Sequence, residues 1–266
     1  TSKLDYIREL GVDFIWLCPV FTSPMVDNGY DISDYLSIDP TFGTMEDMEE
    51  LIAQAKERNM GIMLDLVMNH PSDQHQWFQE ALKDPNSKYR DYYYFREGDG
   101  NGNPPTNWRS VFGGSVWEPV PGEENMYYFH SFAPQQPDLN WGCAEMRQEI
   151  NDIVAFWMNK GVVGFRVDAI NFVKKAAFEN HTADGPDGLV SCFAYTRNVE
   201  DIDEYYRYMK DIFDSNNCVT IAEAVGVPYD QLDTYIGDSG TFTMLFDFSY
   251  TNIDVENEDY FRKTDW

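Results

Sequence analysis

Two carboxylates and one arginine lie at the expected ends of two strands, and their surroundings differ. Arg166 and Asp168 are two residues apart on a strand-like run, so both side chains project from the same face. A guanidinium beside a carboxylate favours the ionised form, which lowers the pKa of Asp168 and suits a nucleophile. Glu223 lies in the run IAEAVG without a basic neighbour in sequence, so we expect its pKa to be raised and the group to donate a proton. Two carboxyl groups with such opposed environments are typical of retaining cleavage of a glycosidic bond.

Two other interpretations of these charged residues remain open at this point. Any single one could form a structural ion pair, but four polar strand ends at one edge of a sheet favour a functional site. The further polar ends are DLVMNH (65–70), with Asp65, Asn69 and His70, and the segment VDNGYDISDY (26–35). A divalent metal site would need carboxylates in similar environments, and the positive charge of Arg166 argues against it. We therefore predict no metal ligands here.

Short apolar runs alternate with longer helical patterns along the chain, which predicts the α/β class. The runs typical of buried parallel strands are residues 13–20, 61–67, 164–170, 218–224 and 244–249. Helical patterns cover residues 44–59, 144–160 and 199–215, with a short helix near 74–83. Before the helix at 144–160 lies a stretch of about sixty residues rich in Tyr, Trp, Gly, Asn and Pro, and such a long loop is usually functional or a subdomain.

The strand count predicts an incomplete barrel. Five strands cannot close a (β/α)8 barrel, and the pattern starts and stops without terminal signals, so we interpret the chain as a segment of a longer protein. An open doubly wound sheet is the alternative, but it predicts a Gly-rich phosphate loop that this sequence lacks.

Composition excludes several classes of protein. The 266 residues include 19 Lys and Arg against 46 Asp and Glu, a net charge of −27 that disfavours nucleic-acid binding. Neither an apolar leader nor a run of the ~18–20 apolar residues of a membrane helix is found, so we expect a cytoplasmic protein without a membrane partner. The four cysteines form no CxxC pair and are expected to be reduced.

At the level of motifs, the sequence resembles the alpha-amylase family, glycoside hydrolase family 13. DLVMNH (65–70), GFRVDAI (164–170) and EAVG (223–226) are similar to three of its conserved regions, and QPDLN (136–140) is similar to a fourth in the form typical of the oligo-1,6-glucosidase and alpha-glucosidase subfamily. VDNGYDISDY and FGGSVW (112–117) are similar to further segments of that subfamily. The resemblance implies part of a (β/α)8 barrel, about strands 2–6. Residues 1–70 and 141–266 would form the barrel, and residues 71–140 the insertion that the family calls domain B.

The resemblance also implies a role for each matching residue. Asp168 would be the nucleophile, Glu223 the general acid and then base, and Arg166 the group that orients and ionises Asp168. Residues implied to line the pocket of the terminal glucose are Asp27, Tyr30 and His70, with Phe112 and Phe132 as aromatic walls. Asp65 and Asn69 would support the strand ends. Ala169 follows the nucleophile, and in this subfamily a residue smaller than Val there goes with a preference for alpha-1,4 bonds.

The predicted function is that of a retaining, exo-acting alpha-glucosidase acting on short malto- or isomalto-oligosaccharides. The alternatives are a trehalose-6-phosphate hydrolase or related transglucosidase, or a non-catalytic barrel scaffold or inactive fragment. No cofactor is required; calcium is possible in the full-length protein, but the family's calcium loop and its third catalytic Asp have no counterpart in these 266 residues. The expected partner is a small oligosaccharide, and the oligomeric state is not predicted.

Overall fold

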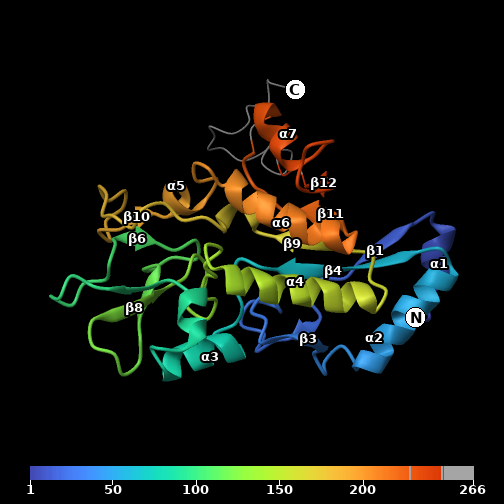
Figure 1. Ribbon diagram of the computed structural model, residues 1–266, viewed down its shortest axis with the longest axis horizontal. Coiled ribbons are helices and arrows are strands. Elements are labelled where there is room, and N and C mark those ends of the chain that lie inside the picture. The colour runs from blue at the N-terminus through green and yellow to red at the C-terminus, as the bar shows by residue number, and fades with distance from the viewer. Residues whose placement is uncertain (228, 247, 249–266) are drawn as a thin grey trace.

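A five-stranded parallel sheet forms the centre of the computed structural model, which describes residues 1–227, 229–246 and 248 (Figure 1). Its strands, in spatial order, are β1 (Phe14–Trp16), β4 (Gly61–Val67), β9 (Gly164–Asp168), β11 (Val219–Ala222) and β12 (Met244–Leu245). All four neighbouring pairs are parallel. The sheet confirms the predicted α/β class and the partial barrel, and each of the five expected apolar runs contributes one strand. The last of these runs extends to residues 247 and 249, which lie outside the described residues.

The connecting helices occur where the apolar periodicity predicts them. They are α2 (Met45–Glu57), α4 (Ala144–Asn159) and α6 (Asp203–Asn216), and α4 and α6 pack side by side (Figure 1). Helix α2 begins with a capping box in which Thr44 and Asp47 satisfy each other's backbone N–H groups. Helix α6 begins four residues later than expected. Shorter helical segments are α1 (Leu4–Glu9), η2 (Ile170–Phe172), α5 (Phe193–Thr196), η3 (Tyr229–Gln231) and α7 (Leu232–Tyr235).

Strand β1 departs from the expectation that every strand is covered on both faces. Strands β4 and β9 are buried almost throughout, but Phe14 and Trp16 of β1 are 48% and 37% exposed. In the described residues β1 pairs with β4 alone, so one edge and part of its faces stay open. Its apolar sequence therefore correctly predicts a strand but not its burial.

The long segment between β4 and α4 builds its own sheet. It contains α3 (Gln76–Lys83), η1 (Lys88–Tyr92) and the antiparallel strands β5 (Phe95–Glu97), β8 (Met126–Phe129) and β7 (Trp117–Pro119). Its strand β6 (Trp108–Arg109) pairs with β10 (Val190–Ser191), which lies beyond β9 in sequence. A small antiparallel pair, β2 (Phe21–Thr22) and β3 (Asp34–Ile38), precedes α2. The division into residues 1–70, 71–140 and 141–266 stays a prediction, because this aromatic region draws on two parts of the chain.

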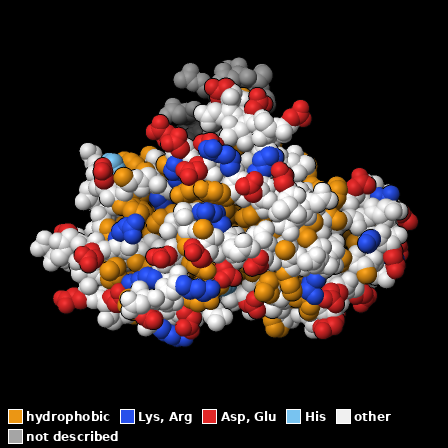
Figure 2. Space-filling model, viewed as in Figure 1, with side chains coloured by type: hydrophobic (Ala, Val, Ile, Leu, Met, Phe, Trp, Pro, Cys, Tyr) orange, Lys and Arg blue, Asp and Glu red, His pale blue; other side chains and the backbone are white. Residues whose placement is uncertain are grey.

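The charged side chains at the surface and the state of the cysteines match the expectations from composition. Figure 2 shows acidic side chains spread over the visible face with Lys and Arg between them. All four cysteines are free thiols. Among the described residues, no helix has the length and apolar character needed to cross a membrane.

Candidate active site

Arg166 joins the carboxylates of three neighbouring strand ends. Its Nη1 lies 2.6 Å from Asp168 Oδ1 and 2.6 Å from Asp65 Oδ1, and its Nη2 contacts Glu223 Oε2. The sheet register explains this arrangement, because Asp65 of β4 is paired with Arg166 of β9. Glu223 follows β11 directly, and its backbone N–H donates to Val167 of β9 at 2.8 Å. The strand ends thus bring together two carboxylates that are 55 residues apart in sequence.

The electrostatics differ from the sequence-based expectation for both carboxylates. Burial raises the pKa of Asp168 well above its usual value, and the nearby Glu223 and Asp65 add to the rise while Arg166 opposes it. The prediction of a lowered pKa for Asp168 is therefore wrong. Glu223 has no basic neighbour in sequence, but the expectation of apolar surroundings is wrong, because Arg166 reaches it from another strand. Burial likewise raises the pKa of Asp65 to about 6. The positive charge of Arg166 therefore does not offset the cost of burying the charges of Asp65 and Asp168.

All the predicted catalytic and sugar-binding residues line one cavity of about 490 Å³. They are Asp27, Tyr30, His70, Phe112, Phe132, Arg166, Asp168 and Glu223. A volume of this size is within the usual range for a small-molecule site. Phe132 contacts both aromatic neighbours, with ring centroids 5.2 Å from His70 and 5.7 Å from Phe112. The aromatic wall is therefore continuous with the polar end of the cavity.

The loop that carries Asp27 and Tyr30 is held by a buried carboxylate that sequence reasoning missed. Asp31 accepts hydrogen bonds from the backbone N–H groups of Val26 and Asp27, at 3.0 and 2.9 Å. Tyr30 is anchored at its other end, where its hydroxyl donates to Asp65 Oδ2 at 3.2 Å. The common Asp turn accepts from a backbone N–H two residues further on, so the segment DNGYD gave no standard signal of these contacts, which reach back four and five residues.

Asp65 and Asn69 lie behind the cavity and do not line it. Asp65 also accepts from Trp16 Nε1 at 3.2 Å, so it links three strand ends. Asn69 donates to Asp138 Oδ2 at 3.3 Å and lies 3.1 Å from His70 Nδ1. Both are buried, and this placement fits the supporting role predicted for them.

Several further lining residues had no clear sequence signal. They are Val111, Asn171, Phe172, Phe193, Arg197 and Val225, and Ala169, which the sequence analysis had singled out, lines the cavity with them. Most come from the turns after β9 and β11, where no periodicity marks a cavity-facing side chain. Asn171 is the exception, because a polar residue inside the run AINFV is unusual. Its Nδ2 donates to the Val225 carbonyl at 2.8 Å and so ties the two turns together.

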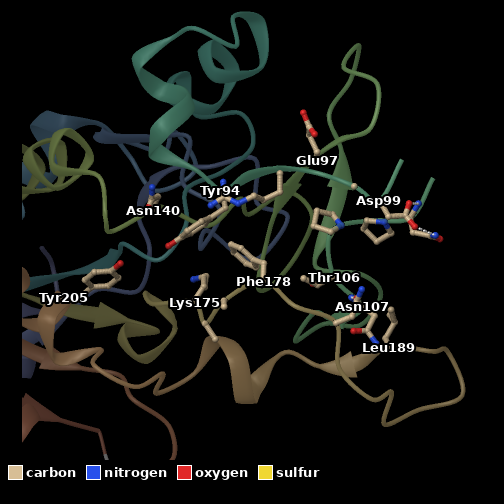
Figure 3. Close-up of a pocket in the computed structure, with 18 residues that line it drawn as sticks. Tyr94, Glu97, Asp99, Thr106, Asn107, Asn140, Lys175, Phe178, Leu189 and Tyr205 are labelled. Atoms are coloured by element: carbon tan, nitrogen blue, oxygen red, sulfur yellow. Dashed lines mark hydrogen bonds between the residues drawn. The ribbon is translucent and has the colours of Figure 1, made fainter. Parts of the chain in front are cut away.

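A larger cavity, of about 1050 Å³, lies elsewhere and contains none of the predicted site residues. Figure 3 shows its lining, with Tyr94 and Phe178 near Lys175 and with Thr106 and Asn107 farther along the cavity. The Lys175 ammonium is buried and forms an ion pair with Asp138 at 2.7 Å. Within the part of the chain that the structure describes, no three His, Cys, Asp or Glu side chains are grouped as a metal site requires.

Comparisons with known proteins agree with this fold. The family model described as the alpha-amylase catalytic domain matches residues 1–265. An oligo-1,6-glucosidase of Bacillus cereus is 42% identical over 255 residues, covering 95% of this chain and 45% of that protein. A trehalose-6-phosphate hydrolase of Escherichia coli is 41% identical over 254 residues, with the same coverage. The crystal structure of Bacillus licheniformis trehalose-6-phosphate hydrolase superimposes with a TM-score of 0.88 at 38% identity, over 96% of this chain and 45% of that one. The chain thus spans about half the length of the relatives it matches.

Proposed function

Because the chain belongs to the alpha-amylase family, we propose that the full-length protein is a retaining, exo-acting alpha-glucosidase. It would hydrolyse the terminal alpha-glucosidic bond of short malto- or isomalto-oligosaccharides. The observation that carries this proposal is the contact of Arg166 with both Asp168 and Glu223 at one cavity. The family relatives named as glucosidases support the same class of reaction.

The proposed reaction proceeds in two displacements. Asp168 attacks the anomeric carbon and forms a glucosyl ester, while Glu223 gives its proton to the leaving oxygen; water, deprotonated by Glu223, then cleaves the ester. Asp168 and Glu223 contact the two Nη atoms of the same guanidinium. Two carboxyl groups held so near each other favour the retaining mechanism, because the inverting one needs them about 6.5–9.5 Å apart to leave space for a water.

Burial raises the pKa of Asp168, so this carboxyl group must lose a proton before it can act as the nucleophile. Arg166 then stabilises the charge that stays on Asp168. Neither step needs a metal ion or an organic cofactor. A calcium ion bound by the full-length protein would have no part in this mechanism.

The substrate pocket supports recognition of a chain end. Asp27, Tyr30 and His70 would bind the outer hydroxyls and face of the terminal glucose, and Phe112 and Phe132 would cover it. Trehalose-6-phosphate hydrolysis is the second candidate, because Arg197 also lines this cavity and could contact a phosphate on the leaving sugar. A cytoplasmic location is part of the proposal, since free cysteines are typical of reducing compartments.

The test compares the full-length wild type with Asp168→Asn and Glu223→Gln on p-nitrophenyl alpha-glucoside, maltose, isomaltose and trehalose 6-phosphate. We expect Glu223→Gln to lower kcat by about 10²–10⁴-fold, the usual contribution of general acid–base catalysis. Asp168→Asn should lose more, because it removes the covalent step. Glu200→Gln is the matched control, an exposed carboxylate that should leave all rates unchanged.

The anomer released first distinguishes the mechanisms. Proton NMR of fresh product should show alpha-glucose, and beta-glucose as the first product would contradict retention. If the folded wild type is inactive on all four substrates, the scaffold interpretation replaces the enzymatic one. If the wild type is active, its preferred substrate decides between an alpha-glucosidase and a trehalose-6-phosphate hydrolase.

A further inference from the structure

Gln136, the first residue of the QPDLN motif, is fully buried directly behind the cavity wall. Its Nε2 lies 2.9 Å from Asp27 Oδ2 and 3.1 Å from His70 Nε2. These two partners come from different parts of the fold, one after β2 and the other after β4. Gln136 is itself supplied by the long segment before α4, so it connects three separate segments of chain at the cavity.

The orientation of the Gln136 amide is fixed by its other end. Its Oε1 accepts the backbone N–H of Ala133 at 3.1 Å, and a backbone N–H can only donate. The NH2 group is therefore turned towards Asp27 and His70, with one hydrogen for each. An apolar residue or a reversed amide could not serve both partners.

His70 has a second amide on its other side. The Asn69 Nδ2 lies 3.1 Å from His70 Nδ1, so both ring nitrogens face amide NH2 groups. A protonated ring carries N–H donors at both nitrogens and would find no acceptor in either amide, whereas the neutral ring has one unprotonated nitrogen that accepts from one of them, so this setting favours neutral imidazole. Burial acts in the same direction and lowers the pKa of His70 to about 4. The charged groups nearest the ring are Asp27, Asp138 and Lys175.

We propose that Gln136 is a positioning residue that holds Asp27 and a neutral His70 in the geometry that binds the terminal glucose. This inference rests on the proposed function. Gln136 does not line the cavity, and it acts on the sugar through its two partners. Sequence alone marks QPDLN as a motif, whereas the structure assigns a task to its first side chain.

The test uses two variants of the full-length enzyme and one control. Gln136→Leu removes both hydrogen bonds and should lower kcat/KM on p-nitrophenyl alpha-glucoside by about 10- to 100-fold, as expected for the loss of a hydrogen bond to a charged group. The control is Gln135→Leu, the preceding glutamine, which is partly exposed and accepts the Asp73 backbone N–H through its own backbone carbonyl. It should keep wild-type kcat/KM. Thermal unfolding checks that each variant is folded.

Gln136→Glu separates positioning from a purely structural role. This change keeps the shape of the side chain but places a second carboxylate beside Asp27. The two carboxylates repel each other unless a proton is bound between them, which requires a lower pH. We expect the ratio of variant to wild-type kcat/KM to rise as the pH falls from 8 to 5, because proton uptake restores a hydrogen bond to Asp27. A structural defect would give a ratio that does not change with pH.

The outcomes are distinct. A pH-independent ratio for Gln136→Glu, or a folded Gln136→Leu as active as Gln135→Leu, overturns the positioning role while the glucosidase proposal stands. A wild type that cleaves no alpha-glucoside overturns the proposed function instead. If Gln136→Leu does not fold, the pH dependence of the isosteric Gln136→Glu decides.

Discussion

Ala169 adopts a left-handed backbone conformation, with φ 44° and ψ 39°, directly after the proposed nucleophile. Its side chain lines the cavity beside Asp168 and Phe172. A larger residue here would reduce the space available to the sugar on the leaving side. Pocket differences of about one methylene are worth ~1–3 kcal/mol in discrimination between substrates. This position can therefore change linkage preference without changing the chemistry.

We predict that Ala169→Val lowers the ratio of maltose to isomaltose hydrolysis by about tenfold or more, since one methyl-sized difference discriminates at that level. Valine is also strained at positive φ, so the variant should unfold at a lower temperature. Ala169→Gly is the matched control, because it relieves the strain without adding bulk and should not shift the ratio towards isomaltose. An unchanged ratio in folded Ala169→Val would show that this residue does not set the linkage.

At the level of elements, helix α3 begins with a histidine cap in place of the usual Ser, Thr, Asp or Asn. His75 Nδ1 accepts the backbone N–H of Trp77 at 3.1 Å, and its ring lies 4.3 Å from the Trp77 ring between centroids. Burial lowers the pKa of His75 to about 4 from its usual 6.5. The cap works as an acceptor, so it requires the neutral ring.

The titration of His75 predicts an acid-sensitive fold. Between pH 6.5 and about 4 the unfolded chain binds a proton at this residue and the folded chain does not, so stability falls as the pH falls. At pH 5 the loss is about 2 kcal/mol relative to pH 7, from 1.36 kcal/mol for each pH unit below 6.5. His75→Asn keeps an acceptor at the cap but does not titrate. Denaturant unfolding at pH 7 and pH 5 should show a smaller decrease for the variant, and an equal decrease would contradict this role.

Secondary structure was largely predictable because the apolar runs of the central sheet are local signals. The residues of β4 and β9 are buried on both faces. Their sequences, GIMLDLV and GFRVD, are apolar at most positions, and this predicts such burial. Burial of β1 was not predictable, because it depends on which strands pair beside it. The pairing of β6 with β10 was missed for a similar reason, since it joins residues about 80 positions apart.

The residues of the site were more predictable than their electrostatics. Polar side chains after parallel strands indicate a site without any knowledge of the contacts. The pKa of Asp168 depends instead on burial and on Glu223, which is distant in sequence. Gln136 belongs to the motif QPDLN, but the sequence did not indicate its role, because its partner Asp27 lies 109 residues away. Such contacts follow from the assembled fold and not from local pattern.

For the molecule as a whole, a buried ion pair connects the long insertion to the segment that follows β9. Lys175 and Asp138 are paired at 2.7 Å, with side chains 2% and 0% exposed. Asp138 also accepts from the backbone N–H of Ser131 at 2.7 Å, and Lys175 Nζ donates to the carbonyl of Phe172 at 2.5 Å. The pair therefore holds together the two chain segments that supply Phe132 and Phe172 to the cavity.

We predict that Lys175→Met lowers the free energy of unfolding by about 3–5 kcal/mol, because removing one partner leaves the other charge buried and uncompensated. Lys174→Met is the matched control; its ammonium lies 5.7 Å from the Tyr205 ring, and the loss should stay below about 1 kcal/mol. Combining Lys175→Met with Asp138→Asn removes both charges, so the double variant should lose less than the sum of the two single changes. Denaturant unfolding of the full-length protein measures the free energy of unfolding of the three single variants, Lys175→Met, Lys174→Met and Asp138→Asn, and of the double variant. Additive losses would mean that the connection between the insertion and the sheet rests on packing of its aromatic side chains and not on this ion pair.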